Sequence, residues 1–318
     1  MSLVARRLEI LGFGSTHADT RHSRVLAIAE HLCPSLNGAS SYRFARAIEA
    51  QGVDPARGFV TDEEEEDYEW LLDGANRAGS DRVQHWRSEL GRLAEAGIRM
   101  VDVLDDDYPA NLRMVHNRPP FLMVRGDLEF ADVRAIAVVG TRDATPRGRE
   151  AAFHISEQLA ARQVTVVSGL ARGIDTAAHE GSLAGGGRTI AVFGTGIEVT
   201  YPSENRGLAD RISAHGACVS QFLPGMRGAR WSFPARNLVT SGLSLGTVVV
   251  EAGETSGARL QAMAAIDHGK RVLLLSALVD QQPWAAEAAS RPGVIVVDSV
   301  DRVVEAVDRE LQSDVLVM

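Results

Sequence analysis

The 318-residue sequence contains only two cysteines, Cys33 and Cys218, and a single lysine, Lys270. The cysteines form no CxxC pair and lie in apolar sequence, which predicts buried free thiols rather than a disulfide or a metal site. No run of 18 apolar residues occurs, and residues 1–30 are too charged for a secretory signal. We therefore expect a cytoplasmic protein that does not contact a membrane.

Positive charge is also scarce, because 33 basic residues face 42 acidic ones and the net charge is −9. This balance disfavours a protein that coats duplex DNA over its whole surface, but it is compatible with a local basic groove. Nearly all the cations are arginines, whose planar fork suits phosphate. The acidic run DEEEED at 62–67 is interpreted as a solvated segment, because consecutive carboxylates diverge around a helix. No metal site and no cofactor are predicted.

The first part of the chain, residues 1–128, shows helical rather than strand periodicity. It ends in a lead-in segment where prolines interrupt any helix and FLMVRG at 121–126 has the pattern of a short strand. These features predict a small helical N-terminal domain. Its apolar residues recur three or four apart at 25–32, 42–49 and 83–96.

The second part, residues 129–318, alternates short apolar runs with helical patterns. The runs are rich in Val and Ile and lack polar alternation, as expected of strands buried on both faces, and most are separated by room for a helix. The pattern predicts an α/β domain with a doubly wound, mostly parallel sheet. The expected strands lie at 135–140, 164–167, 189–193, 217–220, 247–252, 271–275 and 294–297.

Glycine-bearing turns follow four of these expected strands, at 140–142, 168–173, 194–196 and 253–257. In a parallel sheet the carboxyl ends of the strands share one edge, and ligands bind there against helix N-termini. Glycine lets backbone N–H groups approach an anion at the positive end of a helix dipole. One such turn could serve helix capping alone. Four on one edge, two of them carrying arginine, favour a phosphate site.

Several catalytic and nucleotide-binding signatures are missing. Neither GxxxxGK[ST] nor a GxGxxG followed by the expected acidic residue occurs, which disfavours ATP hydrolysis and ordinary NAD binding. No GxSxG elbow surrounds Ser168 or another serine. Asp175 and His179 could share a helix face, but no third ligand lies nearby in the sequence. We interpret Asp175 as a first-turn residue that fixes the preceding loop.

Four segments resemble the DNA-processing protein A family, also called DprA or Smf. They are VVGTRDATPRGREAA, VVSGLARGIDTAAHEGSLAGGGRTIAVFGTGIEVTYPSEN, FPARNLVTSGLS and VVVEAGETSGARLQA. The likeness covers about residues 105–280 and implies an extended Rossmann domain. The resemblance also implies that the protein is a homodimer and is not an enzyme. It implies that the protein protects single-stranded DNA during transformation and loads the RecA recombinase onto it.

The resemblance also assigns site residues. Arg142 matches the arginine of the first loop, Arg236 and Asn237 match the Phe-Pro-x-Arg-Asn segment, and Arg172 is included for its charge alone. The full predicted set for DNA or phosphate is Gly140, Thr141, Arg142, Ser168, Gly169, Arg172, Gly173, Asp175, Gly194, Gly196, Arg236, Asn237, Ser256 and Gly257.

Aromatic residues near this segment could contact bases. Trp231 is the predicted platform, because Arg227 and Arg230 precede it on the same loop. Phe222 and Phe233 are interpreted as core residues, since they neighbour apolar or helix-capping sequence.

The chain also departs from the family pattern at three places. It has Gln221 where the family has Glu, Leu238 where the family has Arg, and Ser-Ala at 276–277 where the family has Pro-Gly. We also expect no C-terminal winged helix, because the sequence stops shortly after the last predicted helix. Losing an arginine predicts weaker DNA binding. Two other functions therefore stay open. One is a nucleotide sensor of the wider superfamily, in phage defence or stress. The other is a phosphoribohydrolase, although the PGGxGTxxE loop keeps only Gly246, Thr247 and Glu251.

Overall fold

The computed structural model describes residue 11 and residues 18–33, 38–52 and 61–314, which form two compact units. Unit 1 comprises residues up to Tyr108, residues 117–124 and residues 221–223. Unit 2 comprises the rest of the chain from Pro109 onward. The two units interleave along the sequence, and the predicted division between residues 128 and 129 stays a prediction.

Unit 1 is largely helical, with α2 (Ala18–Leu32), α3 (Gly38–Gly52) and α4 (Asp62–Glu95), followed by β1 (Ile98–Asp102). The first four residues of the acidic run form the first turn of α4, where carboxylates stabilise the positive end of the helix dipole. The prediction of a solvated run was wrong for its last residue, because Asp67 is buried and forms an ion pair with Arg43. Thr61 and Glu64 cap this end reciprocally. The three predicted helical segments are present, but the strand β1 was not predicted from the sequence. Cys33 is a buried free thiol, as predicted.

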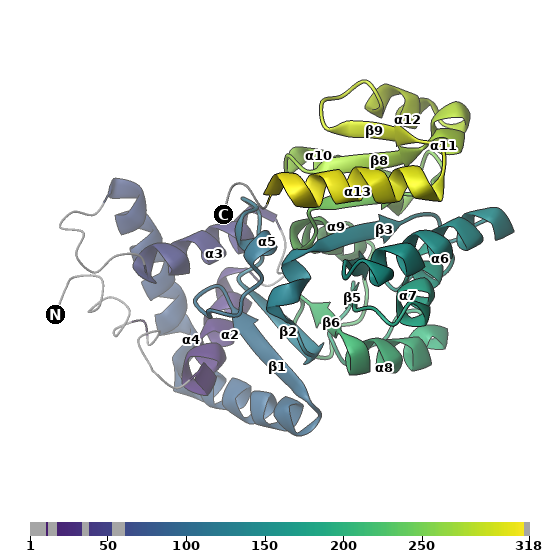
Figure 1. Ribbon diagram of the computed structural model, residues 1–318. Helices are drawn as coiled ribbons and strands as arrows, with labels where there is room; N and C mark the ends of the chain where they lie inside the picture. Colours follow the sequence, from purple (N-terminus) through teal and green to yellow (C-terminus); the bar gives the residue numbers. More distant parts are fainter. Residues whose placement is uncertain (1–10, 12–17, 34–37, 53–60, 315–318) are drawn as a thin grey trace. The chain divides into compact units, whose positions relative to one another are not determined.

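Unit 2 contains seven parallel strands in the order β6-β5-β4-β3-β7-β8-β9 (Figure 1). The predicted doubly wound, mostly parallel sheet is thereby confirmed. The strand bounds are Ala217–Ser220 for β6, Thr189–Val192 for β5, Thr165–Ser168 for β4, Ala135–Val139 for β3, Gly246–Val249 for β7, Arg271–Leu275 for β8 and Val294–Val297 for β9. Strand β2 (Phe121–Gly126) begins in unit 1 and neighbours β1 there.

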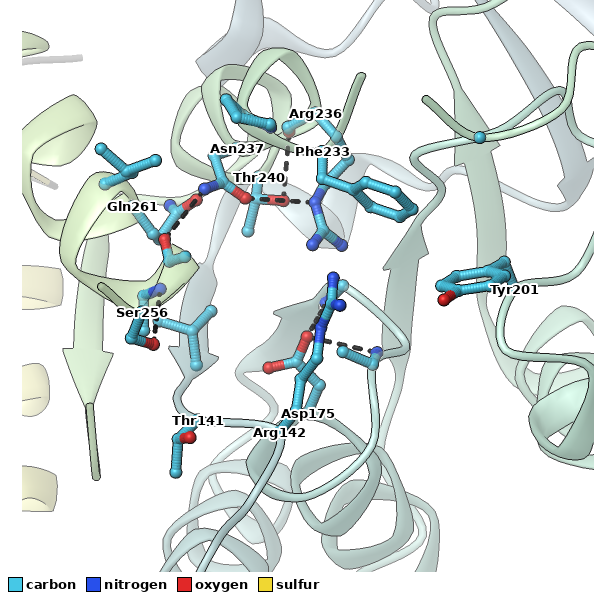
Figure 2. A pocket seen from close by; sticks show the side chains of 18 of the residues that line it. Thr141, Arg142, Asp175, Tyr201, Phe233, Arg236, Asn237, Thr240, Ser256 and Gln261 are labelled. Carbon is cyan, nitrogen blue, oxygen red and sulfur yellow. Dashed lines mark hydrogen bonds between the residues drawn. The ribbon is translucent and has the colours of Figure 1, made fainter. Parts of the chain in front are cut away.

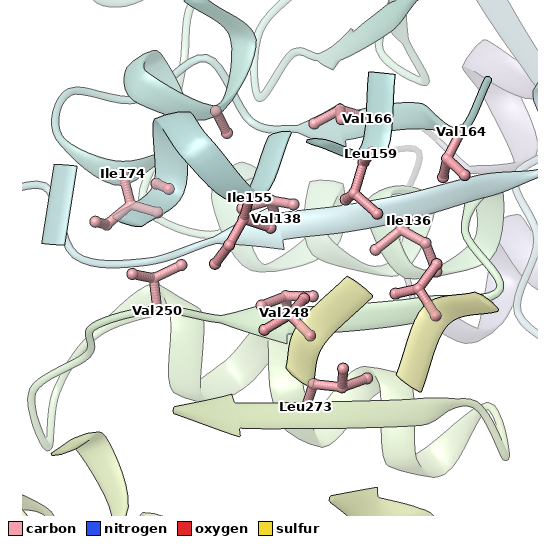
Figure 3. Close-up of a cluster of buried hydrophobic side chains, with 14 of the residues drawn as sticks. Ile136, Val138, Ile155, Leu159, Val164, Val166, Ile174, Val248, Val250 and Leu273 are labelled. Carbon is pink, nitrogen blue, oxygen red and sulfur yellow. The ribbon is translucent and has the colours of Figure 1, made fainter. Parts of the chain in front are cut away.

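Helices cover both faces of the unit 2 sheet. Successive residues of a strand point to opposite sides, so alternate residues of β3 pack against different helices. Ile136 and Val138 pack with α6 (Pro146–Ala161), α7 (Ile174–Ala184) and α13 (Val300–Asp314), as Figure 3 shows for α6 and α7. On the other face, Ala137 and Val139 pack with α10 (Gly257–Asp267), α11 (Ser276–Gln281) and α12 (Pro283–Ala288). Burial on both faces explains why these strands are apolar without alternation.

Three further helices complete unit 2: α5 (Ala110–Arg113), α8 (Arg206–His215) and α9 (Ser232–Leu243). Short 3-10 turns occur at η1 (Phe130–Val133) and η2 (Ser203–Asn205). Among the described helices of both units, none is long and apolar enough to cross a membrane.

The strand order also fixes where a ligand can bind. The chain proceeds from β3 to β4 on one side, and β7 lies on the other side of β3. Loops that leave β3 and β7 therefore diverge and open a crevice at the carboxyl edge of the sheet. The first and fourth predicted glycine turns lie in these two loops.

Candidate functional site

A cavity of about 900 Å³ lies at this edge of the unit 2 sheet. It falls within the range of roughly 300–1,000 Å³ that is typical of ligand sites. Its walls come from the turns after β3, β4, β5 and β7, from the start of α9 and from the N-terminus of α10. Among the lining residues are Gly140, Thr141, Arg142, Gly169, Asp175, Tyr201, Phe233, Arg236, Asn237, Ser256 and Gly257.

Arg236 on α9 is the innermost cation of the cavity, with only 8% of its surface exposed. Its Nη1 donates to the main-chain oxygen of Val192 at 2.8 Å, and its Nε donates to Oδ1 of Asn237 at 3.2 Å. Burial lowers the pKa of Arg236, and the nearby carboxylate of Asp175 opposes this shift. The guanidinium is therefore held rigidly with part of its donor set facing the cavity.

Asp175 in the first turn of α7 is buried and holds the loop that follows β4. Its Oδ2 accepts hydrogen bonds from the backbone nitrogens of Gly169 and Ala171, at 3.2 and 3.3 Å. Burial raises the pKa of Asp175, while Arg236 and the backbone amide of Ala171 act in the opposite direction. The interpretation of Asp175 as a residue that fixes this loop agrees with this geometry.

At two positions of the site, neighbouring atoms approach the backbone so closely that only glycine fits. A Cβ on Gly169 would lie 1.7 Å from Nη1 of Arg236, so only glycine leaves space for the guanidinium. Gly173 has a φ of 76°, and a Cβ there would lie 2.4 Å from the main-chain oxygen of Thr141. The turn after β3 and the turn after β4 can therefore meet at one point of the edge.

Arg142, in the turn after β3, is exposed and lies with its guanidinium carbon 5.3 Å from the centre of the Phe233 ring. Figure 2 shows Arg142 and Arg236 pointing toward one another into the cavity. Their like charges repel each other, and this repulsion adds to the lowering of the pKa of Arg236 by burial. An anion bound between the two guanidinium groups would relieve this repulsion and form charge-assisted hydrogen bonds with both.

Aromatic side chains form one wall of the cavity. Phe233, which the sequence indicated as a core residue, is only half-buried and lines the cavity. Its ring centre lies 5.5 Å from that of Tyr201, which is 53% exposed. Figure 2 shows both rings beside the two arginines. Tyr201 was not singled out from the sequence, although it lies only five residues after Gly196, because its segment is irregular and gives no periodic signal. Trp231, the predicted platform, is 39% exposed and does not line the cavity, so its stacking role stays a prediction.

The opposite wall is the N-terminus of α10, where Ser256 is the N-cap and accepts from the backbone nitrogen of Ala258. Asn237 links this end to α9, because its Nδ2 donates to the main-chain oxygen of Gly257 at 3.1 Å. The amide nitrogen of Gln261 donates in turn to the main-chain oxygen of Asn237 at 2.9 Å. The open end of the α10 dipole thus faces the cavity with its position fixed.

Other predicted site residues support the loops rather than lining this cavity. Ser168 donates to the main-chain oxygen of Val138 at 2.7 Å, and the backbone nitrogen of Gly196 donates to Met226 at 2.8 Å. Gly194 lies against the Phe233 ring. Arg172 is on the surface and forms an ion pair with Glu204. Their assigned contacts with phosphate stay predictions.

Residues considered for catalysis are engaged elsewhere. Glu251 accepts from the hydroxyl and the backbone nitrogen of Thr145, at 2.5 and 2.9 Å, and so holds the N-terminus of α6. Nδ1 of His179 lies 2.7 Å from the hydroxyl of Thr189. Burial lowers the pKa of His179 to about 3, so its ring is neutral at physiological pH.

One cluster of metal-ligand types occurs among the described residues, formed in unit 1 by His22, Asp102 and Asp105. Arg21 donates to the carboxylates of both Asp102 and Asp105. His22 Nε2 lies 2.7 Å from Asp105. The arginine already supplies the positive charge that a cation would bring, so we interpret the cluster as a structural tie within unit 1.

The fold and the cavity define this chain as a Rossmann-type protein with an arginine-lined cavity at the switch point of its sheet. The family model for DNA recombination-mediator protein A matches residues 99–308, and the chain belongs to this family. The sequence resemblance to the DNA-processing protein A family is thereby confirmed.

Individual relatives agree with this assignment. The DNA processing protein DprA of Bacillus subtilis is 35% identical over 184 residues, which cover 58% of this chain and 62% of the relative. A putative DNA processing protein DprA of Mycobacterium tuberculosis is 35% identical over 254 residues, covering 73% and 65%. The chain thus spans less than two thirds of the length of these relatives.

Solved structures show the same fold. The crystal structure of DprA from Streptococcus pneumoniae superposes with a TM-score of 0.72 at 26% identity, covering 92% of this chain and 98% of that chain. DprA from Helicobacter pylori, whose structure was described for its single-stranded DNA binding mode, superposes with a TM-score of 0.60 at 21% identity. It covers 67% of this chain and 96% of that chain, and it supports the fold alone.

Proposed function

We propose that this protein binds single-stranded DNA in the cavity at the carboxyl edge of the unit 2 sheet. The observation that carries the proposal is the convergence of Arg142 and Arg236 on one cavity that also presents glycine turns and the N-terminus of α10. Phosphates would occupy the space between the two guanidinium groups. The protein acts by binding and performs no chemistry on the strand.

The aromatic wall supports a single strand rather than a duplex. Bases that are not paired can stack on the exposed ring of Tyr201 or on the half-buried ring of Phe233, which lies beside the guanidinium of Arg142. Stacking of this kind accepts any base, and phosphate contacts carry no sequence information. Binding is therefore expected to depend weakly on sequence and strongly on salt.

The test is binding of a labelled oligothymidylate by the full chain and by Arg142→Ala. Arg142 is exposed, so its loss should leave folding intact. Removing a charged hydrogen-bond donor of this kind costs about 1.5–3 kcal/mol, which corresponds to roughly 10- to 150-fold weaker binding at low salt. The slope of log K against log salt should also become shallower by about 0.7.

Arg162→Ala is the matched control, because it removes the same charge at the C-terminal end of α6, at the opposite edge of the sheet. It should bind as the unmodified protein does. If Arg142→Ala and Arg162→Ala bound the oligonucleotide equally, the cavity would not be the DNA site.

Family membership supports the finer parts of the proposal. We propose that the protein forms a homodimer, protects single strands during DNA uptake and delivers them to a RecA-type recombinase. The corresponding measurements are the mass of the protein in solution and the rate at which a recombinase forms filaments on strands covered by single-strand binding protein. A monomer with no effect on that rate would contradict these finer parts.

A mononucleotide ligand is the second candidate, since the cavity volume of about 900 Å³ also suits a small molecule. It would use the same arginines and the same helix N-terminus. Calorimetry against a panel of nucleotides separates the two candidates. Micromolar affinity for one nucleotide, without affinity for oligothymidylate, would show that the cavity binds a nucleotide and would contradict DNA binding.

A further inference from the structure

A second, smaller cavity of about 60 Å³ adjoins the main one within unit 2. The two cavities share Arg142, Gly169, Ala171, Tyr201, Phe233 and Arg236 as lining residues. What the second cavity adds is Arg172 and Pro202. Arg172 therefore lies next to the main cavity, beyond the residues that the two cavities share.

Arg172 is already occupied by an acid of the same chain. Its Nε and Nη2 donate to the two carboxylate oxygens of Glu204 at 2.5 and 2.8 Å, which is the bidentate arrangement that a phosphate would also adopt. The two side chains are 63% and 53% exposed. Exposed ion pairs contribute only about 0–1 kcal/mol, so this one can exchange its partner easily.

The position of Glu204 is built into the fold. It lies in the short turn η2, and the next residue, Asn205, ties this turn to the loop after β4. Nδ2 of Asn205 donates to the main-chain oxygen of Leu170 at 2.9 Å and to the hydroxyl of Thr176 at 3.0 Å. Glu204 is thereby held opposite Arg172 independently of any ligand.

We infer that Glu204 acts as an internal competitor that reserves Arg172 for the phosphate of a polynucleotide already bound in the main cavity. The inference rests on the proposed function. A free mononucleotide has a single anionic group, which the main cavity holds, and nothing then displaces Glu204. A strand anchored there presents its next phosphate at an effective concentration in the millimolar range or above, which is sufficient to replace a weak carboxylate partner.

Glu204→Gln tests this inference, because it removes the competing charge at an exposed position and keeps the shape of the side chain. We expect it to bind a dodecamer of thymidylate about two- to fivefold more tightly at low salt, as follows from the free energy of an exposed ion pair. Binding of thymidine 5′-monophosphate should stay within about twofold of the unmodified protein.

Two controls separate competition from general repulsion. Glu180→Gln removes one exposed negative charge further along α7 and should leave dodecamer binding unchanged. In the Arg172→Ala background, Glu204→Gln should lose most of its effect, because no guanidinium remains to be released. An equal gain in both backgrounds, or no gain in either, would overturn the inference.

The same series distinguishes this inference from the proposed function. If Arg142→Ala weakens binding while Glu204→Gln changes nothing, the DNA site stands and the internal competitor does not. If the unmodified protein binds no oligothymidylate, both fail together.

Discussion

Gly169→Ala should be among the most damaging small substitutions in unit 2. The added Cβ would lie 1.7 Å from Nη1 and 2.3 Å from Cζ of Arg236, and both distances are far shorter than any non-bonded contact. The loop cannot retreat without breaking the hydrogen bonds from Gly169 and Ala171 to Asp175. The guanidinium must therefore leave its site.

The magnitude follows from what Arg236 leaves behind. The main-chain oxygen of Val192 loses its 2.8 Å donor, and Asp175, which is 4% exposed, loses its nearest positive charge. A buried carbonyl left without a donor costs about 1–3 kcal/mol, and a buried carboxylate that loses a nearby compensating charge adds to this cost. Movement of the displaced guanidinium into the open cavity recovers part of this cost. We expect Gly169→Ala to lower the free energy of unfolding by about 3 kcal/mol at pH 7.

Urea unfolding followed by far-ultraviolet circular dichroism measures this change. Gly257→Ala is the matched control, because Gly257 also lines the cavity but a Cβ there meets no atom within 4 Å. It should change stability by less than about 0.5 kcal/mol. The loss in Gly169→Ala should shrink in acid, since a protonated Asp175 needs no counter-charge. A loss below about 1 kcal/mol at pH 7 would refute the reasoning.

Two further predictions concern buried titratable groups. The Lys270 ammonium donates to three main-chain oxygens at the C-terminus of α9, at 2.5–2.8 Å. Lys270→Met should therefore lower the free energy of unfolding by about 1–3 kcal/mol in the same urea assay. An unchanged unfolding midpoint would contradict this role. The pKa of His179 is about 3 when folded and 6.5 when unfolded, so the unfolded chain takes up the proton first as pH falls. The stability due to His179 is therefore present above pH 6.5 and is lost in acid by up to about 1.4 kcal/mol per pH unit. His179→Gln should flatten this slope between about pH 6 and pH 4, and an unaltered slope would show that the ring is not responsible.

The sheet of unit 2 could be predicted from the sequence because its signal is local. Runs of Val and Ile without polar alternation show that a strand is buried on both faces, and the intervening helical patterns require parallel neighbours. The glycine turns followed from the same reasoning, since the ends of parallel strands must share one edge. In unit 1, β1 was missed because a single five-residue strand beside long helices gives little periodicity.

The sequence by itself determined the fold class, the family and the edge of the sheet at which the site lies, because each depends on patterns within short stretches of chain. The tertiary structure alone decided which side chains meet there. It brought Tyr201 to Phe233, placed Arg236 in the space left by Gly169, and turned Arg172 toward Glu204 rather than into the main cavity. Such pairings join residues more than 30 positions apart, and their geometry is set by packing and loop closure, which no local pattern encodes.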